Sequence, residues 1–233
     1  MKQFLPLGCL LLLLTGCSKS AVPGPTDAEK GSIRFDCNIS AQVTTIQDGN
    51  TKADQATREL PASCLPDANQ MKLHLTGTST ATEYHYENMA AYDQPLLDPD
   101  DYTAHFTYGD PEAEGPQAAY FEGKTTCTVA ARQTVTQPVT HALANSLYTL
   151  EFSEWFKKYY TSCQIQITTS SGYQSGHTIT SVTDPVPIFV KPNSTLYMSG
   201  TAVKTNGAEV TFPKTEIGTT LARTWHTIVV DAG

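Results

Sequence analysis

Short runs in which apolar and polar residues alternate restrict the fold of this chain more than any other feature. Between residues 70 and 77, Met71, Leu73 and Leu75 point to one side of an extended strand and leave the residues between them on the other side. Gly, Pro, Asn and Asp separate the runs, and Thr, Val, Ile and Tyr are frequent within them. The pattern predicts an all-β protein with strands at residues 32–45, 70–77, 82–87, 102–108, 125–131, 135–140, 147–152, 163–169, 177–182, 187–190, 195–204, 209–212 and 224–230.

Two local signals refine this prediction. Asn206-Gly207 lies between two runs and predicts a β-hairpin, because both residues tolerate a positive φ. Residues 47–66 are polar and rich in Asp, Thr and Pro, and they predict a long excursion with one helical turn.

A single helix is predicted at residues 151–160, with Ser153 as its N-cap. Aromatic side chains recur there at intervals of three and four residues: Phe152, Trp155, Phe156 and Tyr159. The stripe has two interpretations, a plug at the end of a β-sandwich or an exposed platform for a ligand or glycan. We favour the plug, because large aromatic side chains are mostly buried.

The strands on both sides of a polar joint near residues 133–141 predict two tandem β-sandwich domains, at 32–133 and 134–233, of immunoglobulin-like or transthyretin-like type. The short helix falls in the second domain.

The N-terminal segment indicates where the protein works. Lys2 precedes an apolar run that is too short to cross a bilayer, which needs about 20 apolar residues. Leu14-Thr15-Gly16 then stand directly before Cys17. The layout resembles a bacterial lipoprotein signal, in which the preceding peptide is removed and the cysteine thiol carries diacylglycerol.

We therefore predict a signal peptide at residues 1–16, lipidation of Cys17, and a tether at 17–31. Two or three acyl chains, palmitate among them, would hold the protein on the outer membrane of the cell envelope far more firmly than one myristoyl chain. The alternatives are an ordinary cleaved signal with a chance cysteine, or a transmembrane helix.

The charge of the chain excludes one class of partner. Residues 1–16 contain one Lys, so 14 of the 15 basic residues remain in the mature chain against 23 acidic ones, a net charge of −9. No cluster of Lys and Arg is present, and we expect no binding of nucleic acid.

Four cysteines remain in the mature chain besides Cys17: Cys37, Cys64, Cys127 and Cys163. Four cysteines allow three disulfide connectivities in an oxidising compartment. Cys37 and Cys163 alternate with isoleucines on the apolar side of predicted strands, which favours buried thiols over any one disulfide.

Catalytic and metal-binding patterns are not apparent, and we expect no enzyme activity, metal or cofactor. The six histidines show no His-x-x-x-His or His-Glu-x-x-His pair, and Ser175 lacks the Gly-x-Ser-x-Gly context of a hydrolase nucleophile. The acidic region could form a calcium loop or a glycosidase pair, but Thr103 stands where a calcium loop needs Gly, so we favour solvated turns. That region comprises Asp98, Asp100, Asp101, Asp110, Glu112 and Glu114. The tyrosines available for stacking on sugars are Tyr84, Tyr86, Tyr92 and Tyr120. Alternation along a strand would place the same side chains on a half-buried face, and we favour that interpretation.

Four motifs occur in an order that resembles one protein family. They are Tyr108 to Gly115, Ala119 to Gly123, Leu143 to Ser146 and Glu151 to Tyr160, with Leu97 to Tyr102 and Leu221 to His226 as weaker matches. The family consists of Bacteroidota lipoproteins of unknown function with fimbrillin-like character. The resemblance implies tandem sandwiches related to fimbrial subunits and anchors, and it supplies no catalytic residue. Ser18-Lys19-Ser20 replace the acidic residues that often follow the cysteine of surface-exported relatives, so the membrane face stays open.

Two functions follow as hypotheses. The first is adhesion or fimbria-like assembly, in which an added strand joins this protein to fimbrial or other envelope proteins. In such proteins cleavage after a basic residue frees the first strand, and Lys30, Arg34 and Arg58 bracket it here, although we favour their interpretation as ordinary solvated side chains. The alternative is a surface lipoprotein that binds glycan or captures nutrients. A hydrolase ranks third.

Overall fold

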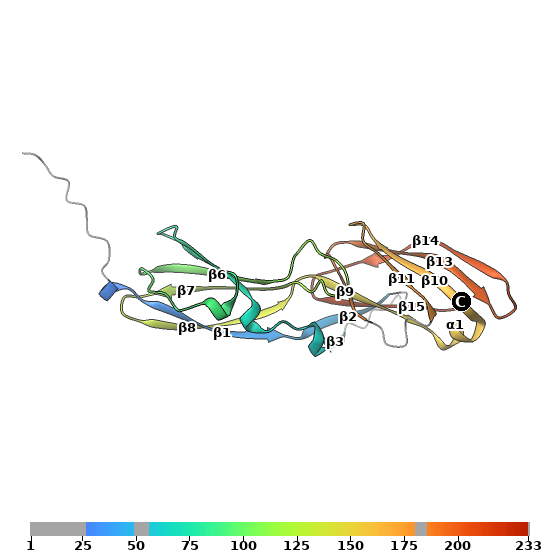
Figure 1. Ribbon diagram of the computed structural model, residues 1–233, viewed down its shortest axis with the longest axis horizontal. Coiled ribbons are helices and arrows are strands. Elements are labelled where there is room, and N and C mark those ends of the chain that lie inside the picture. The colour runs from blue at the N-terminus through green and yellow to red at the C-terminus, as the bar shows by residue number, and fades with distance from the viewer. Residues whose placement is uncertain (1–26, 49–55, 180–185, 233) are drawn as a thin grey trace, which may run out of the picture.

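The computed structural model describes residues 27–48, 56–179 and 186–232, and β-strands dominate these ranges (Figure 1). The strands are β1 (Ser32–Ser40), β2 (Gln42–Asp48), β3 (Ala56–Glu59), β4 (Lys72–Gly77), β5 (Glu83–Tyr86), β6 (Asp100–Tyr108), β7 (Phe121–Val129), β8 (Thr134–Leu143), β9 (Ser146–Phe152), β10 (Tyr160–Thr169), β11 (Gln174–His177), β12 (Ile188–Val190), β13 (Thr195–Lys204), β14 (Glu209–Thr219) and β15 (Thr224–Val230). The helical segments are α1 (Glu154–Tyr159) and the 3₁₀ turns η1 (Asp27–Glu29), η2 (Ala62–Cys64), η3 (Ala68–Gln70) and η4 (Met89–Ala91). The prediction of an all-β fold with one short helix is confirmed.

The strands form three sheets in an elongated molecule with two parts (Figure 1). The first part contains a six-stranded sheet in the order β1-β8-β7-β6-β4-β5. The second contains a five-stranded sheet, β12-β9-β15-β2-β3, and a four-stranded sheet, β11-β10-β13-β14.

The six-stranded sheet curls over its own core. Phe35 of β1 meets Phe106 of β6 edge-on, with ring centroids 5.0 Å apart, although the two strands are not neighbours in the sheet. The Tyr92 hydroxyl, from the loop before β6, donates a hydrogen bond of 2.9 Å to the carbonyl oxygen of Ile33. Strand β1 therefore closes the first core from the side opposite β6.

The second part is a β-sandwich. Leu150 of β9 and Ile228 of β15, both in the five-stranded sheet, share a buried cluster with Ile165 and Ile167 of β10 and Leu196 of β13, in the four-stranded sheet. Burying each such side chain contributes about 1.5–3 kcal/mol, which holds the two sheets together.

The core of the first part includes side chains from strands of the second part. Leu147, Phe189 and Trp225 belong to strands of the second part, yet they are buried in the core cluster of the first. Gly115, in the loop between β6 and β7, also exchanges two backbone hydrogen bonds of 2.9 Å with Phe189. These contacts connect the two parts at several points.

Two segments of the chain pass from one part to the other. The single strand expected at 32–45 is two strands, because strand pairing is interrupted at Ala41. β1 pairs in parallel with β8, and β2 pairs in parallel with β15. The segment β8–β9 crosses in the same direction. The domain boundary expected at 133/134 falls between β7 and β8, which are neighbours in one sheet. The second part also contains the N-terminal strands β2 and β3, so no single point in the sequence separates the two parts.

Local predictions had mixed outcomes. The hairpin at Asn206-Gly207 is confirmed, and Gly207 adopts a φ of 84° in its turn. The excursion at 47–66 contains an unexpected strand, β3, beside the 3₁₀ turn η2. The strand expected at 177–182 is right at His177, the last residue of β11, and wrong at Thr178 and Ile179. The chain pairs earlier than expected, soon after the turn at Gly172. Residues 180–185 lie outside the described residues.

Candidate functional site

Strand β1 lies at the edge of its sheet, and within the described residues its strand pairing is with β8 alone. The pairing is parallel and runs the full length of β1, from Ser32 to Ser40. Ile33 is fully buried, and Phe35, Cys37 and Ile39 follow it at every second position against the same core. A strand with one paired edge and one row of core side chains has the geometry that strand addition requires.

The three basic residues expected to bracket β1, Lys30, Arg34 and Arg58, have different surroundings. Lys30 forms an ion pair of 3.3 Å with Asp27, and Arg34 is exposed on β1. Arg58 lies on the exposed strand β3, with its guanidinium carbon 3.8 Å from the centroid of the buried Trp225 ring. All three lie on the segment that carries or flanks the N-terminal strands.

Two aromatic side chains are exposed on α1. Trp155 is 57% and Tyr159 48% exposed, and their rings stack at 15° with centroids 6.0 Å apart. The Lys158 ammonium lies 4.8 Å and 5.9 Å from the two centroids. Figure 1 shows α1 at the far end of the second part. The pair therefore forms a flat apolar surface with a cation beside it at the tip of the molecule.

The predicted helical stripe is thus divided between core and surface. The plug interpretation is right for Phe152 and Phe156, which are buried and stacked at 5.0 Å, and wrong for Trp155 and Tyr159. The helix begins only after its N-cap Ser153, whose hydroxyl accepts a 3.0 Å hydrogen bond from the Phe156 amide, as predicted. Residues four apart share a helix face, so Trp155 and Tyr159 both point to one side of Phe156, at about 100° and about 60° from it.

The carboxylates before and within β6 organise turns. Asp100 accepts hydrogen bonds of 2.9 Å from the backbone amides of both Ser79 and Thr80, in the turn between β4 and β5. These bonds, the Thr80 amide first, lower the pKa of Asp100 well below its ordinary value of 3.8. Asp101 accepts a 2.6 Å hydrogen bond from the Thr128 hydroxyl of β7. Both groups thus serve local structure.

The carboxylates after β6 connect the two parts. Glu114 accepts hydrogen bonds from the Ser171 hydroxyl at 2.6 Å and from the Lys191 amide at 3.0 Å. The Lys191 ammonium pairs with Glu112, and that contact raises the pKa of Lys191. The acidic region therefore does more than provide solvated turns, since two of its six residues, Glu112 and Glu114, hold the second part against the first.

All four described cysteines are free thiols. Cys127 and Cys163 are buried, and Cys37 and Cys64 are half-buried. Burial raises the pKa of the Cys37 thiol to about 11, with the neighbouring Asp36 adding to the shift, so this thiol is protonated and unreactive at neutral pH.

The tyrosines considered for sugar stacking are half-buried. Tyr84, Tyr86 and Tyr92 pack against the core of the first part, and Tyr86 and Tyr92 meet edge-on at 5.1 Å. Tyr120 donates a 2.7 Å hydrogen bond to Glu122. These side chains close the core and do not form an exposed row.

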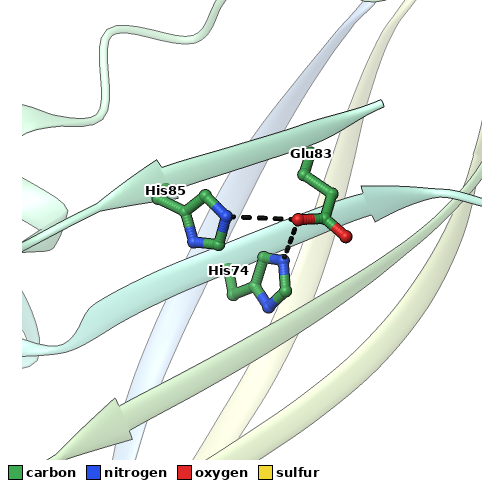
Figure 2. A group of neighbouring side chains, drawn as sticks. All are labelled: His74, Glu83 and His85. Atoms are coloured by element: carbon green, nitrogen blue, oxygen red, sulfur yellow. Dashed lines mark hydrogen bonds and ion pairs between the residues drawn. The ribbon is translucent and has the colours of Figure 1, made fainter. Parts of the chain in front are cut away.

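One group of polar side chains was not anticipated. His74 of β4 and Glu83 and His85 of β5 lie together on the exposed face of the hairpin, as Figure 2 shows. The spacings His-x-x-x-His and His-Glu-x-x-His place ligands on one helix face, whereas these residues meet through the pairing of two strands. The sequence does contain a signal for this group. Glu83 and His85 are two residues apart on the strand predicted at 82–87, and the preceding predicted strand, 70–77, carries His74 on its polar side.

Cys17 and the expected signal peptide lie outside the described residues. Among the residues that the structure describes, no helix combines the length and the apolar character needed to cross a bilayer.

The fold defines an all-β protein of two connected parts, and its exposed features suit contact with other molecules. The chain belongs to the family described as a domain of unknown function, DUF4493, whose model matches residues 29–233. The resemblance to a family of unknown function is thereby confirmed. No curated protein matches the chain.

Solved structures with a related arrangement come mostly from Bacteroides. A "putative cell adhesion protein" from Bacteroides ovatus has 12% identity and a TM-score of 0.42, with 88% of this chain and 92% of that chain covered. A fimbrial protein from the same species has 10% identity and a TM-score of 0.42, with 88% and 49% covered. A "putative polysaccharide binding" protein from Bacteroides thetaiotaomicron has 9% identity and a TM-score of 0.42, with 86% and 90% covered. Similarities of this size do not transfer a function.

Proposed function

We propose that this protein is a lipid-anchored, non-catalytic component of the bacterial cell envelope that acts by contact, as an anchor or accessory subunit of a fimbria-like assembly. The Leu-Thr-Gly-Cys motif at 14–17 supports anchoring through Cys17. The engagement of Asp100 in a turn, of Asp101 in a cross-strand hydrogen bond and of Glu114 in contacts between the parts supports a role without catalysis.

The observation that carries the proposal is the placement of β1. An edge strand held in parallel by one neighbour is easier to exchange than a central strand, because only one ladder of strand hydrogen bonds must break. The bond from Tyr92 to Ile33 and the bridge between Gly31 and Leu97 must open with it. Its alternating core residues, Ile33 and Phe35 first, fix the register of whatever strand takes its place.

Removal of the N-terminal strands would leave a groove shaped for a strand with apolar side chains at alternate positions. β1 and β2 follow one another along the molecule (Figure 1), and they pair in parallel with β8 in the first sheet and with β15 in the second. Without them, the side of Phe106 that Phe35 covers would open to solvent. A strand from another molecule with apolar residues at alternate positions would fill the same groove.

The test uses the full chain extracted from membranes in detergent and treated briefly with trypsin. Cleavage after the exposed Arg58 should release the N-terminal strands, and the remaining chain should then form multimers on size-exclusion chromatography. A synthetic peptide of residues 31–48 should prevent this by refilling the groove. The same preparation should carry a diacylglycerol-modified Cys17 by mass spectrometry.

The matched control is the same peptide with Phe35→Asp and Cys37→Asp, which keeps the length but cannot bury its alternate side chains. It should fail to prevent association. A cleaved chain that stays monomeric, with no partner recovered from membranes, contradicts assembly by strand addition. An unmodified Cys17 contradicts the anchor.

A second candidate function, glycan binding, is supported by the Trp155–Tyr159 pair. Stacked aromatic rings that are about half exposed offer the flat apolar face on which sugar rings pack. On a glycan array, Trp155→Ala should lose at least about tenfold in affinity for any glycan that the wild-type chain binds, because burying a large apolar side chain contributes about 1.5–3 kcal/mol. Leu221→Ala removes an apolar side chain of similar exposure elsewhere and should bind as the wild type does. An array without a hit removes this candidate.

A further inference from the structure

The hairpin of β4 and β5 places three potential metal ligands on one exposed face. His74 and His85 are directly opposite each other in the antiparallel register, and their rings stack at 4.2 Å. Glu83 precedes His85 by two residues, so its side chain lies on the same face of β5. The core residues Leu73 and Leu75 occupy the other face of β4, which fixes the orientation of the histidine row.

A carboxylate of the neighbouring strand β6 fixes the turn of this hairpin and thereby its register. The Asp100 carboxylate binds the amides of Ser79 and Thr80 at the turn, and the Thr80 hydroxyl donates a further 3.0 Å hydrogen bond to it. A slip of one residue would send His74 to the core face, so these contacts preserve the pairing of the two histidines.

The separations between the ligand atoms fit a bound cation. The Nε2 atoms of His74 and His85 both point at one carboxylate oxygen of Glu83, at 3.6 Å and 3.4 Å (Figure 2). A tetrahedral Zn²⁺ with bonds of about 2.0–2.1 Å places its ligand atoms about 3.3–3.4 Å apart. Two of the three separations are therefore already close to the spacing that a shared metal imposes, and all three ligand atoms lie within 4.8 Å of one another.

The donor set selects the class of cation. Two imidazole nitrogens and one carboxylate oxygen suit zinc, copper or nickel, whereas calcium and magnesium prefer oxygen ligands alone. Lys72, the nearby cation, is paired with Glu87 at 3.3 Å, which reduces its repulsion of a metal ion. The Thr76 hydroxyl, 3.3 Å from Nε2 of His74, would have to turn away on binding.

We propose that His74, Glu83 and His85 form a binding site for a divalent transition-metal ion, with zinc as the best-fitting ion and a fourth position open to solvent. The side chains are 41%, 55% and 63% exposed, so an ion reaches the site without any opening of the fold. A ligand atom of another molecule can occupy the fourth position, which makes this outer face of the first part a metal-dependent contact.

The test is calorimetric titration of the full chain in detergent with ZnCl₂ after treatment with a chelator. The wild-type chain should bind one Zn²⁺, and the double variant His74→Ala/His85→Ala should lose this binding. Glu83→Gln keeps the size of the side chain and should weaken binding at least about tenfold. CaCl₂ should give no binding at this site.

The matched control is His105→Ala. His105 lies directly opposite His74 on β6 and is similarly exposed, but its Nε2 pairs with Glu122 at 3.4 Å. This variant should bind zinc as the wild type does. Exposed His–Glu pairs contribute little to stability, so all variants should retain the wild-type circular dichroism spectrum. Absence of zinc binding in the wild-type chain, unchanged binding in the double variant, or an equal loss in His105→Ala would each overturn the proposal.

Discussion

Replacing Trp225 by alanine is expected to lower the free energy of unfolding by about 3–5 kcal/mol. The indole is 2% exposed, and although β15 belongs to the second part, it fills the core of the first. Its Nε1 donates a 3.0 Å hydrogen bond to the buried Thr149 hydroxyl, and Arg58 covers its face. The variant therefore loses packing and a hydrogen bond where the parts meet. Urea unfolding followed by circular dichroism measures the loss.

The chain supplies its own control for this prediction, because it contains only two tryptophans. Trp155 is 57% exposed, and Trp155→Ala should change the free energy of unfolding by less than about 0.5 kcal/mol. Trp225→Phe keeps most of the buried area and should fall between the two. A cost below about 1 kcal/mol for Trp225→Ala would show that the indole does not join the two parts.

Acidification from pH 7.5 to 5 is expected to lower the free energy of unfolding by about 2 kcal/mol through His141 alone. The ring is fully buried in β8, with its centroid 4.9 Å from that of Phe106. Within the described residues, neither ring nitrogen has a hydrogen-bond partner. A Cβ at Gly123 would lie 2.2 Å from Nδ1, so a glycine is needed there to admit the ring.

The sign follows from the proton balance. Burial lowers the pKa of His141 from 6.5 to about 4 in the folded chain, so between these values the unfolded chain binds the extra proton. The stabilisation is complete above pH 6.5 and is lost as the pH falls toward 4. Burial also lowers the pKa of His177, which acts in the same direction. The depressed pKa of Asp100 matters only below its ordinary value of 3.8, outside this range.

The measurement compares urea unfolding at pH 7.5 and 5 for the wild type and His141→Leu. The leucine has a similar volume and no titrating group, so the variant should lose much less stability on acidification than the wild type. His105→Leu, at an exposed position on the same sheet, should keep the wild-type dependence. An equal loss in the wild type and in His141→Leu would contradict the assignment.

Local chemistry was enough to predict much of the fold. Alternation at Met71, Leu73 and Leu75 predicted β4, since side chains on a strand repeat every two residues whatever lies around them. Asn206-Gly207 predicted its hairpin and Ser153 its helix cap for the same reason. These features depend on the backbone preferences of a few adjacent residues.

Other features depended on partners distant in the sequence. The interruption between β1 and β2 at Ala41 does not show in the alternating pattern of the sequence. The two strands are distinct because each pairs in a different sheet. Glu114 looked like part of a solvated turn, yet its partner Lys191 lies 77 residues away. No local pattern can specify such pairings.

The sequence by itself determined that this chain forms many short strands with one polar and one apolar side, because that property belongs to each run of residues. Only the tertiary structure decided how the strands are grouped into sheets, which aromatic residues of α1 stay exposed, and that His74, Glu83 and His85 meet. Those outcomes follow from register between strands, and register is set by the burial of the whole chain.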